Sequence, residues 1–351
     1  MSEQIGFIGL GLMGRPMVRR LAEHYDVIAF DLDADRFEGL ESVARAESVA
    51  EVASSATTIL MSLPTTAAVE AVVLGDDGLL GAMGRNGGAG YGSARAGDRA
   101  GGELATGALV IDMSTTQPLE SKRIAEALAE RGAAFVDAPV SGGPAGAEAG
   151  TLSIMAGCDD GVFERAESYL SKIGGSVVRV GGPGSGGVAK LVNNMIVGAA
   201  FISVAEGFAV AAANGIDLST LHEAIRGGWA GSKVLDLSAE AVSKGDFRPT
   251  GTVDLLSKDL GYARDLARAD KIPIPVTAIV DEVFTAAKAR GTGGNFQAVI
   301  IELWEKLLDR PIGANAAGRG TVSRSGARDT PGAGSTAGSA DTSDNTKEHT
   351  E

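Results

Sequence analysis

A glycine-rich motif near the start of the sequence most constrains the fold of this chain. The apolar run Ile5–Ile8 leads directly into Gly9-Leu-Gly11-Leu-Met-Gly14, and a stretch with helical spacing follows at Arg15–Glu23. A strand that enters a helix through a tight glycine turn is the first unit of a βαβ fold. The motif therefore predicts a sheet whose strands are connected by helices.

Strand-like and helix-like segments alternate through the first half of the chain. Short apolar runs rich in branched residues predict the strands, and the alternation indicates a parallel sheet with helices on both faces. The predicted strands are Ile5–Leu10, Asp26–Phe30, Thr57–Leu63, Leu109–Ser114, Ala133–Val140, Leu152–Ala156 and Val177–Val180. Helices are predicted between most of these strands, for example at Arg15–Glu23, Thr65–Leu74 and Pro118–Glu130.

The pattern changes at the glycine-rich segment 181–187, where no regular structure is expected. Beyond it, helical periodicity replaces the alternation. We predict an α/β Rossmann-like N-terminal domain with a parallel sheet over residues 1–183, followed by an all-α C-terminal domain over residues 184–310. The predicted helices of the second domain are Val188–Ala213, Leu218–Arg226, Lys258–Arg268, Pro275–Arg290 and Phe296–Leu308.

Two segments lack the apolar periodicity of packed elements. Residues 85–103 contain seven glycines and predict a flexible surface insertion. Residues 311–351 contain only Ile312 and Val322 from the set of Leu, Ile, Val and Phe. Such a composition buries too little apolar surface to offset the entropy of ordering, so we predict a disordered tail.

Charge and composition restrict the expected partners. The formal net charge is −14, and an acidic surface repels nucleic acids and anionic membranes. The apolar region Val188–Ala213 is interrupted by polar residues, so we expect no membrane span. The apolar helices exceed what one small helical domain can bury, which predicts a homodimer or homotetramer.

We expect a cytoplasmic protein. The first residues, Met1–Leu10, form a strand-like run rather than a signal peptide. The single cysteine, Cys158, excludes an intramolecular disulfide and fits a reducing compartment.

The glycine loop has the spacing of a dinucleotide-binding site. The first glycine permits the tight turn, the second lets a pyrophosphate approach the backbone, and the third lets the helix pack close to the strand. The alternative is an ordinary strand-to-helix turn. The candidate cofactor-binding residues of the loop are Gly9, Leu10, Gly11, Leu12, Met13 and Gly14.

An acidic residue at the end of the second predicted strand indicates which dinucleotide binds. Asp31 follows Ala29-Phe30 and can accept both ribose hydroxyls, whereas it would repel the 2′-phosphate of NADP. We therefore expect NAD as the cofactor in preference to NADP. Asp33 is the alternative acidic residue near this strand end, and it could equally cap the following helix.

Three further segments carry a family resemblance. They are Asp137-Ala-Pro-Val-Ser141-Gly142-Gly143, Gly184-x-Gly186-x-x-x-Lys190-x-x-Asn193-Asn194 and Lys258-Asp259-Leu260. Together with the glycine loop, they resemble the motifs of the β-hydroxyacid dehydrogenase family, in the same order, from Met1 to about Leu308. The resemblance implies an oxidoreductase that exchanges a hydride with a small 3-hydroxy acid, and Asn193 would contact the substrate.

The proposed substrate turn also makes chemical sense by itself. Ser141, Gly142 and Gly143 follow a predicted strand, so their backbone N–H groups and one hydroxyl could cradle a small carboxylate. The alternative is a sharp loop without a ligand.

Lys190 is the candidate proton-transfer residue. It shares one face of a nearly all-apolar helix with Asn194, about 40° away. A lysine there either extends to solvent or has a function, and the adjoining glycine-rich loop favours function. Desolvation would lower its pKa towards neutrality, where it could exchange the hydroxyl proton, with Asn194 aligning the reacting groups.

The resemblance also implies cofactor contacts from Leu63 and Pro64, from Thr115, and from Lys258. The first three lie at the carboxyl ends of predicted strands, where a doubly wound sheet binds its ligand. Lys258 would close over the nicotinamide, and its alternative is a solvated helix start. No metal site is expected.

Within the family, the retained Lys190 and Asp31 favour NAD-dependent oxidation of 3-hydroxyisobutyrate. Reduction of tartronate semialdehyde (2-hydroxy-3-oxopropionate) is the alternative enzyme activity. A redox-inactive, NAD-sensing protein on the same fold is the alternative from another class.

Overall fold

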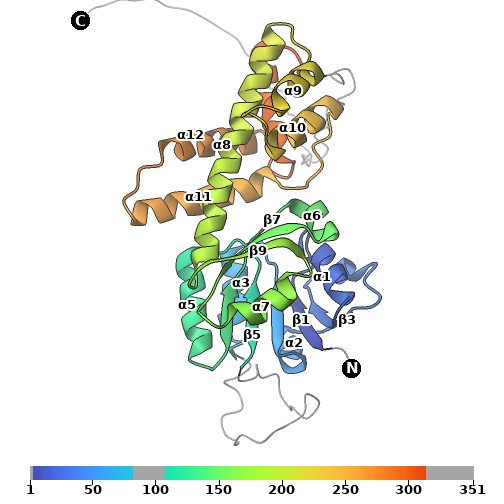
Figure 1. Cartoon of the computed structure of the whole chain (residues 1–351), viewed down its shortest axis with the longest axis vertical. Coiled ribbons are helices and arrows are strands. Elements are labelled where there is room, and N and C mark those ends of the chain that lie inside the picture. Colours follow the sequence, from blue (N-terminus) through green and yellow to red (C-terminus); the bar gives the residue numbers. More distant parts are fainter. Residues whose placement is uncertain (1–2, 82–106, 314–351) are drawn as a thin grey trace, which may run out of the picture. The chain divides into compact units, whose positions relative to one another are not determined.

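The computed structural model describes residues 3–81 and 107–313 (Figure 1). The insertion predicted at 85–103 lies outside the described residues, as does the predicted tail beyond residue 313. Ile312, near the start of that predicted tail, is buried against the helical core.

A sheet with strand order β3-β2-β1-β4-β5-β6-β8-β7 organises the first half of the described chain, and β9 pairs with β8. From β3 to β6 every neighbouring pair is parallel, which confirms the predicted α/β class. The strands are β1 (Gln4–Ile8), β2 (Asp26–Phe30), β3 (Ala44–Arg45), β4 (Thr58–Met61), β5 (Leu109–Asp112), β6 (Ala134–Asp137), β7 (Val140–Ser141), β8 (Leu152–Gly157) and β9 (Gly174–Gly181).

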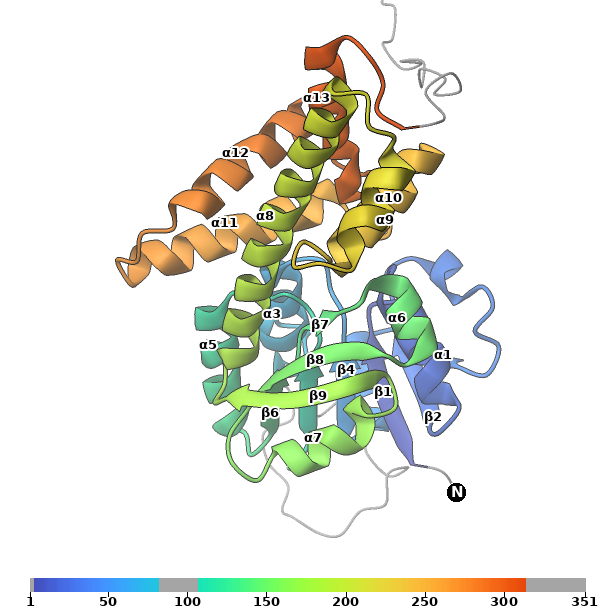
Figure 2. The same cartoon turned by 45° about the horizontal axis from the view of Figure 1, so that its top comes forward.

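The far edge of the sheet departs from the parallel pattern. Strand β8 runs antiparallel to both β6 and β7, and it pairs in parallel with β9 (Figure 2). The single strand expected over Ala133–Val140 is divided into β6 and β7, because Pro139 has no N–H to donate to a ladder. Its carbonyl still accepts a hydrogen bond from Met155 N at 3.1 Å.

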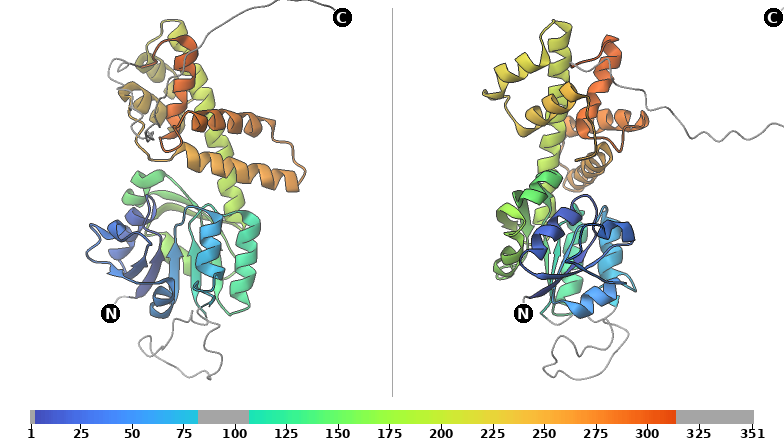
Figure 3. Two further views of the ribbon diagram at one scale, coloured as in Figure 1. Left: turned by 180° about the vertical axis from the view of Figure 1, so that it is seen from behind. Right: turned by 90° about the vertical axis from the view of Figure 1, so that its right-hand side faces the viewer.

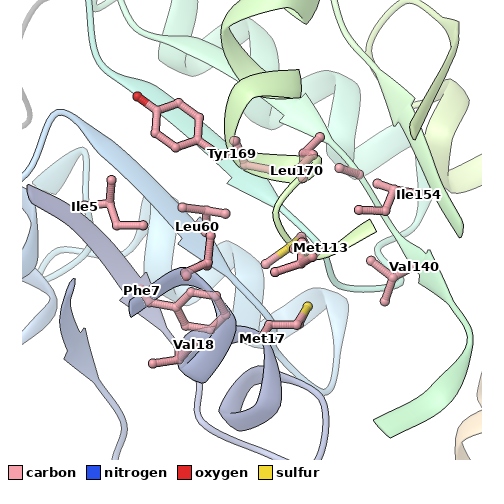
Figure 4. Packing of buried hydrophobic residues seen from close by; sticks show 14 of the residues in the cluster. Ile5, Phe7, Met17, Val18, Leu60, Met113, Val140, Ile154, Tyr169 and Leu170 are labelled. Atoms are coloured by element: carbon pink, nitrogen blue, oxygen red, sulfur yellow. The ribbon is translucent and has the colours of Figure 1, made fainter. Parts of the chain in front are cut away.

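Alternate strand residues pack into two cores, one on each face of the sheet. In β4, Leu60 belongs to one core, whereas Ile59 and Met61 belong to the other. Figure 4 shows the core that contains Leu60, where Phe7 lies against α1. The covering helices are α1 (Gly14–Ala22), α2 (Val49–Ser55), α3 (Thr66–Leu74), α5 (Pro118–Ala129), α6 (Gly143–Ala149) and α7 (Phe163–Leu170), with the short 3₁₀ helix η1 (Ala34–Phe37) after β2.

Side-chain caps determine where several helices begin. Ser48 accepts a hydrogen bond from Glu51 N at the start of α2, and Thr65 accepts one from Ala68 N at the start of α3. Each cap satisfies a backbone donor that has no partner within the helix. The caps of the later helices are Asp217, Ser232 and Thr252.

The second half of the described chain is helical around the long helix α8. Phe201, Phe208 and Phe284 belong to its buried core. Figure 3 shows α11 and α12 from behind. The elements are α8 (Ser185–Ala213), α9 (Leu218–Arg226), α10 (Lys233–Lys244), α11 (Val253–Ala269), α12 (Pro275–Ala289), the 3₁₀ helix η2 (Gln297–Ile300) and α13 (Ile301–Leu308).

By length and composition alone, α8 is apolar enough to cross a membrane, and it is the one such helix among the described residues. It is also the central helix of the helical core, packed against α10, α11, α12 and α13. Core helices of soluble proteins pass the same test of length and hydropathy.

Candidate functional site

The carboxyl ends of the parallel strands lie in register. Ile8 pairs with both Phe30 and Met61, Met61 pairs with Asp112, and Asp112 pairs with Asp137. The loops that follow these five residues therefore leave the sheet at one edge. Open α/β sheets bind their ligands at this edge.

The glycine loop has the geometry of a cofactor cradle. Gly9 has a φ of 95°, and a Cβ there would collide with the Ser62 carbonyl. A Cβ at Gly14 would collide with the Gly9 carbonyl, because α1 starts so close to β1. Nothing lies within 4 Å of the place where a Cβ of Gly11 would stand. The loop is thus closed on the protein side and open at Gly11, as a bound pyrophosphate requires.

The other loop residues face in different directions. The side chain of Leu10 is fully buried in the core of the sheet, Met13 is partly buried against it, and Leu12 is exposed. Any contact of Leu10 with a ligand would therefore come from its backbone.

Asp31 ties the end of β2 to the glycine loop. Its Oδ2 accepts a hydrogen bond from Leu10 N at 2.6 Å, and its Oδ1 accepts one from Asp33 N at 2.8 Å. Asp33 has the capping role that the sequence allowed, because it accepts a hydrogen bond from Asp35 N at the start of η1. The two carboxylates thus have separate roles, and Asp31 is the one beside the loop.

The loops after β4 and β5 are joined to each other. Leu63 N donates a hydrogen bond to Ser114 Oγ at 2.8 Å, whereas Pro64 is exposed. In the next residue, the carbonyl of Thr115 accepts a hydrogen bond from Lys258 Nζ at 3.4 Å. Thr115 on the sheet side and Lys258 on α11, both predicted to touch the cofactor, are therefore in direct contact with each other.

Lys190 lies in the second turn of α8 and points to the predicted substrate turn. Its Nζ donates a hydrogen bond to the Val140 carbonyl at 2.7 Å, next to Ser141. Burial lowers the pKa of the Lys190 ammonium, while the negative charge of Asp259 opposes the shift and Lys258 adds to it. A lysine in this setting can exchange protons closer to neutral pH than an exposed one.

Asn194 lies one turn further along α8 and is held on both sides. Its Nδ2 donates to Asp259 Oδ2 at 2.6 Å, and its Oδ1 accepts from Asn193 Nδ2 at 2.8 Å. The other oxygen of Asp259 accepts a hydrogen bond from Lys258 at 2.8 Å. An amide has two donor hydrogens and two lone pairs, so Asn194 retains one of each for a ligand.

The turn at Ser141–Gly143 requires glycine for its backbone. Gly142 has a φ of 137° and Gly143 a φ of 66°, conformations that residues with a Cβ rarely adopt. The turn connects β7 to α6, so its N–H groups precede a helix start. Across from it, the Thr250 carbonyl lies 3.7 Å from the Cβ position of Gly143.

Sequence reasoning did not assign a role to Asp259, although it lies within the recognised Lys-Asp-Leu motif. Asp259 is almost fully buried, on the same face of α11 as Leu256, Leu260 and Ala263. An acidic residue in an apolar helical stripe is expected to have a polar partner. That pattern was the available signal, and Asn194 and Lys258 are the partners.

No group of three or more His, Cys, Asp or Glu that could hold a metal ion occurs within residues 3–81 and 107–313.

Two known protein families match consecutive parts of the chain. Residues 4–182 match the family described as the NAD binding domain of 6-phosphogluconate dehydrogenase. Residues 184–304 match the family described as the NAD-binding domain of NADP-dependent 3-hydroxyisobutyrate dehydrogenase.

Individual relatives share most of the chain. 2-(Hydroxymethyl)glutarate dehydrogenase of Eubacterium barkeri is 35% identical over 310 residues, which cover 87% of this chain and 96% of the relative. 2-Hydroxy-3-oxopropionate reductase of Escherichia coli is 32% identical, with 88% and 99% covered. The structure of Mycobacterium tuberculosis 3-hydroxyisobutyrate dehydrogenase with L-serine is similar with a TM-score of 0.72 at 27% identity, covering 86% of this chain and 99% of that one.

Proposed function

This chain belongs to the β-hydroxyacid dehydrogenase family of NAD(P)-dependent oxidoreductases, and on that premise we propose that it oxidises 3-hydroxyisobutyrate reversibly with NAD. Lys190 serves as the general acid and base. The observation that carries this proposal is the contact between Lys190 Nζ and the Val140 carbonyl, which places the amine beside the turn Ser141–Gly143.

The hydride and the proton are transferred by different groups. A nicotinamide cofactor held at the glycine loop would supply the hydride acceptor for oxidation of the carbinol carbon and the hydride donor for reduction. In oxidation, neutral Lys190 takes the hydroxyl proton as the C–O bond becomes a carbonyl. In reduction, the Lys190 ammonium gives that proton back to the oxygen. The lowered pKa of Lys190, caused mainly by burial, favours the neutral amine that oxidation needs.

The substrate carboxylate belongs at the turn. Backbone N–H groups of Gly142 and Gly143 and the Ser141 hydroxyl are neutral donors that suit a carboxylate. Asn193 and Asn194 line the same helix face as Lys190 and hold the reacting oxygen in line with it. Lys258 lies between the Thr115 carbonyl and Asp259, where it closes the cofactor side of the site.

NAD rather than NADP follows from Asp31. Its carboxylate lies beside the Leu10 amide at the glycine loop, where the adenosine ribose of a bound dinucleotide is expected. A 2′-phosphate there would meet a negative charge. The loop residues Gly9, Leu10, Gly11, Leu12, Met13 and Gly14 support the phosphates, and Leu63 and Pro64 complete this side.

The relatives do not identify one substrate. The relatives that share about a third of their residues with this chain carry different substrate names, among them 2-hydroxy-3-oxopropionate reductase. Reduction of tartronate semialdehyde is therefore the second candidate, and the retained Lys190 serves it equally well. The 3-hydroxyisobutyrate dehydrogenase solved with L-serine supports a small 3-hydroxy acid in either case.

We also propose that the enzyme is a cytoplasmic homodimer or homotetramer, without a nucleic acid or membrane partner. Helices α8 and α12 carry exposed branched residues, with 66% of Ile196 and 66% of Ile279 accessible. Exposed apolar residues on these helices favour assembly with a second copy. Lys190, Asn193 and Asn194 along α8 argue that this helix belongs to a soluble site rather than a membrane.

The test is a panel of substrates with NAD and NADP in parallel: 3-hydroxyisobutyrate, glycerate, L-serine, 3-hydroxypropionate and, for reduction, tartronate semialdehyde. We expect the highest kcat/KM for 3-hydroxyisobutyrate with NAD. A preference for tartronate semialdehyde selects the second candidate activity. Tight NAD binding in calorimetry without turnover of any acid, at low or high salt, contradicts the enzyme and supports NAD sensing.

A further inference from the structure

A buried carboxylate that takes no part in the mechanism above lies at the start of the catalytic helix. Asp137 ends β6 and only 2% of it is accessible. Its Oδ1 accepts a hydrogen bond from Gly184 N at 2.7 Å, and its Oδ2 accepts one from Gly187 N at 2.8 Å. From the end of β6, Asp137 therefore caps the start of α8, where it satisfies backbone donors that the helix itself leaves without partners.

The packing around this cap leaves no room for adjustment. A Cβ at Gly186 would collide with the carbonyls of Asp137 and Met155. A Cβ at Gly157 would stand 2.6 Å from Asp137 Oδ1 and 2.7 Å from Gly186 N. The first turn of α8 is therefore held directly against the ends of β6 and β8, with Asp137 between them.

The same short segment fixes both ends of the Lys190 contact. Lys190 follows Gly187, which donates to Asp137, by three residues on α8. Val140, whose carbonyl accepts from Lys190 Nζ, follows Asp137 by three residues. Asp137 thus connects the helix that carries Lys190 to the short segment after β6 that carries the Val140 acceptor and leads into the substrate turn.

We propose that ionised Asp137 is a positioning residue, which anchors the first turn of α8 and thereby places Lys190 against Val140. The inference rests on the proposed function, because Lys190 must be the proton-transfer group. A carboxylate accepts from both amides at once. In a protonated carboxyl, the oxygen that carries the hydrogen becomes a donor and a weaker acceptor, so the hydrogen bond from one of the two N–H groups is weakened.

Burial and a neighbouring charge make this residue sensitive to pH. The pKa of Asp137 is raised to about 7, mainly by burial; the two amides oppose the shift, and the charge of Asp112 contributes to it. Asp112 is the register partner of Asp137 on β5 and is also fully buried. The other ionisable groups that face this region are Cys158 after β8, Arg179 on β9, which bonds the Cys158 carbonyl, and Lys122 on α5, beside Gly184.

The first arm of the test is Asp137→Asn, assayed in the direction of aldehyde reduction with NADH and the aldehyde that the wild type reduces. Asparagine keeps the volume but turns a donor towards one of the two amides. We expect kcat to fall by about a hundredfold, the loss typical of a catalytic group misplaced by about 1 Å. The affinity for NADH, measured by calorimetry, should stay within about twofold of wild type. Asp217→Asn is the matched control, because Asp217 caps α9 on the surface. Its kcat should stay within about twofold of wild type.

The second arm is a pH profile, which also serves if Asp137→Asn does not fold. In reduction Lys190 must be protonated and so sets the alkaline limb, leaving the acid limb to Asp137. Asp112→Asn removes the neighbouring charge, and its amide can still bond Ser114 N and the Thr116 hydroxyl. We expect the acid limb to move to lower pH, because the pKa of Asp137 falls with that charge.

The outcomes separate the inference from the function it rests on. A wild type without turnover contradicts the proposed function, and the inference with it. A wild type that turns over while Asp137→Asn keeps more than about half its kcat, or while Asp112→Asn leaves the acid limb unmoved, contradicts the inference alone.

Discussion

Asn194 on α8 donates a hydrogen bond to Asp259 on α11, with 2.6 Å between Nδ2 and Oδ2. Through its other oxygen the same carboxylate accepts from Lys258, which reaches the Thr115 carbonyl on the sheet. Asp259 thus joins the amide one turn beyond Lys190 to the lysine on the cofactor side. It also acts on Lys190 at a distance, because its negative charge raises the pKa of that ammonium.

Asp259→Asn should therefore change both the rate and its pH dependence. Loss of the ion pair with Lys258 should lower kcat by about tenfold or more. Loss of the negative charge lowers the pKa of Lys190, so the neutral amine needed for oxidation persists to lower pH. The acid limb of kcat for NAD-linked oxidation should therefore move to lower pH.

Asp265→Asn on the same helix is the control, since Asp265 is exposed and pairs with Arg268. It should leave the rate and the profile unchanged. An acid limb that stays in place or moves to higher pH in Asp259→Asn would show that Asp259 does not act on the proton-transfer group.

Two alanine substitutions in the glycine loop should have opposite effects on stability and on NAD affinity. Gly11→Ala adds a methyl group in open space, so the melting temperature should not change. The affinity for NAD should fall by about tenfold or more, because the methyl group blocks the approach of the phosphates. Gly9→Ala introduces a Cβ at a φ of 95° against the Ser62 carbonyl and should lower the melting temperature. Thermal unfolding and calorimetric titration distinguish the two. A stable Gly11→Ala that binds NAD as wild type does would place the cofactor elsewhere.

Asp31 should decide between the two dinucleotides. Asp31→Ser removes the charge that repels a 2′-phosphate, so the ratio of kcat/KM for NAD to that for NADP should fall by about tenfold or more. Asp33→Asn, two residues away, keeps an oxygen to cap η1 and should leave the ratio as it is. An unchanged ratio in Asp31→Ser would assign cofactor choice to other residues.

Assembly should depend on the exposed apolar surface of α12. Ile279→Asp puts a charge where 66% of an isoleucine is accessible, so light scattering should show a lower molar mass than for the wild type. Leu307→Asp on α13, where the leucine is 82% accessible, is the comparison at a second exposed site. A wild type that is a monomer, or an Ile279→Asp protein of unchanged mass, would contradict assembly through α12.

The elements with clear periodicity were predictable from the sequence. Asp26–Phe30 and Leu218–Arg226 occur with the expected bounds as β2 and α9. The helices α2, α6, α7 and α10 were missed. Helix α6 (Gly143–Ala149) contains glycine, alanine and proline in place of an apolar stripe, so no period exists to detect. It forms because its small residues fit against β8 and α1.

Other differences arise from contacts that a sequence pattern cannot show. Helix α11 begins at Val253, five residues before the predicted start, because Thr252 caps it. The segment Phe296–Leu308 divides into η2 and α13 instead of forming one helix. For the site, motifs indicated the roles of Lys190, Asn194 and Lys258. Asp137 and Asp259 lie in the same motifs, but the partners they bind depend on which segments meet in space.

Lys190→Ala is the most direct test of proton transfer by Lys190. We expect NAD affinity within about twofold of wild type and a kcat lowered by about a thousandfold. The rate should recover in part when methylamine is added to replace the missing amine. A kcat within about tenfold of wild type, with no response to methylamine, would contradict proton transfer by Lys190.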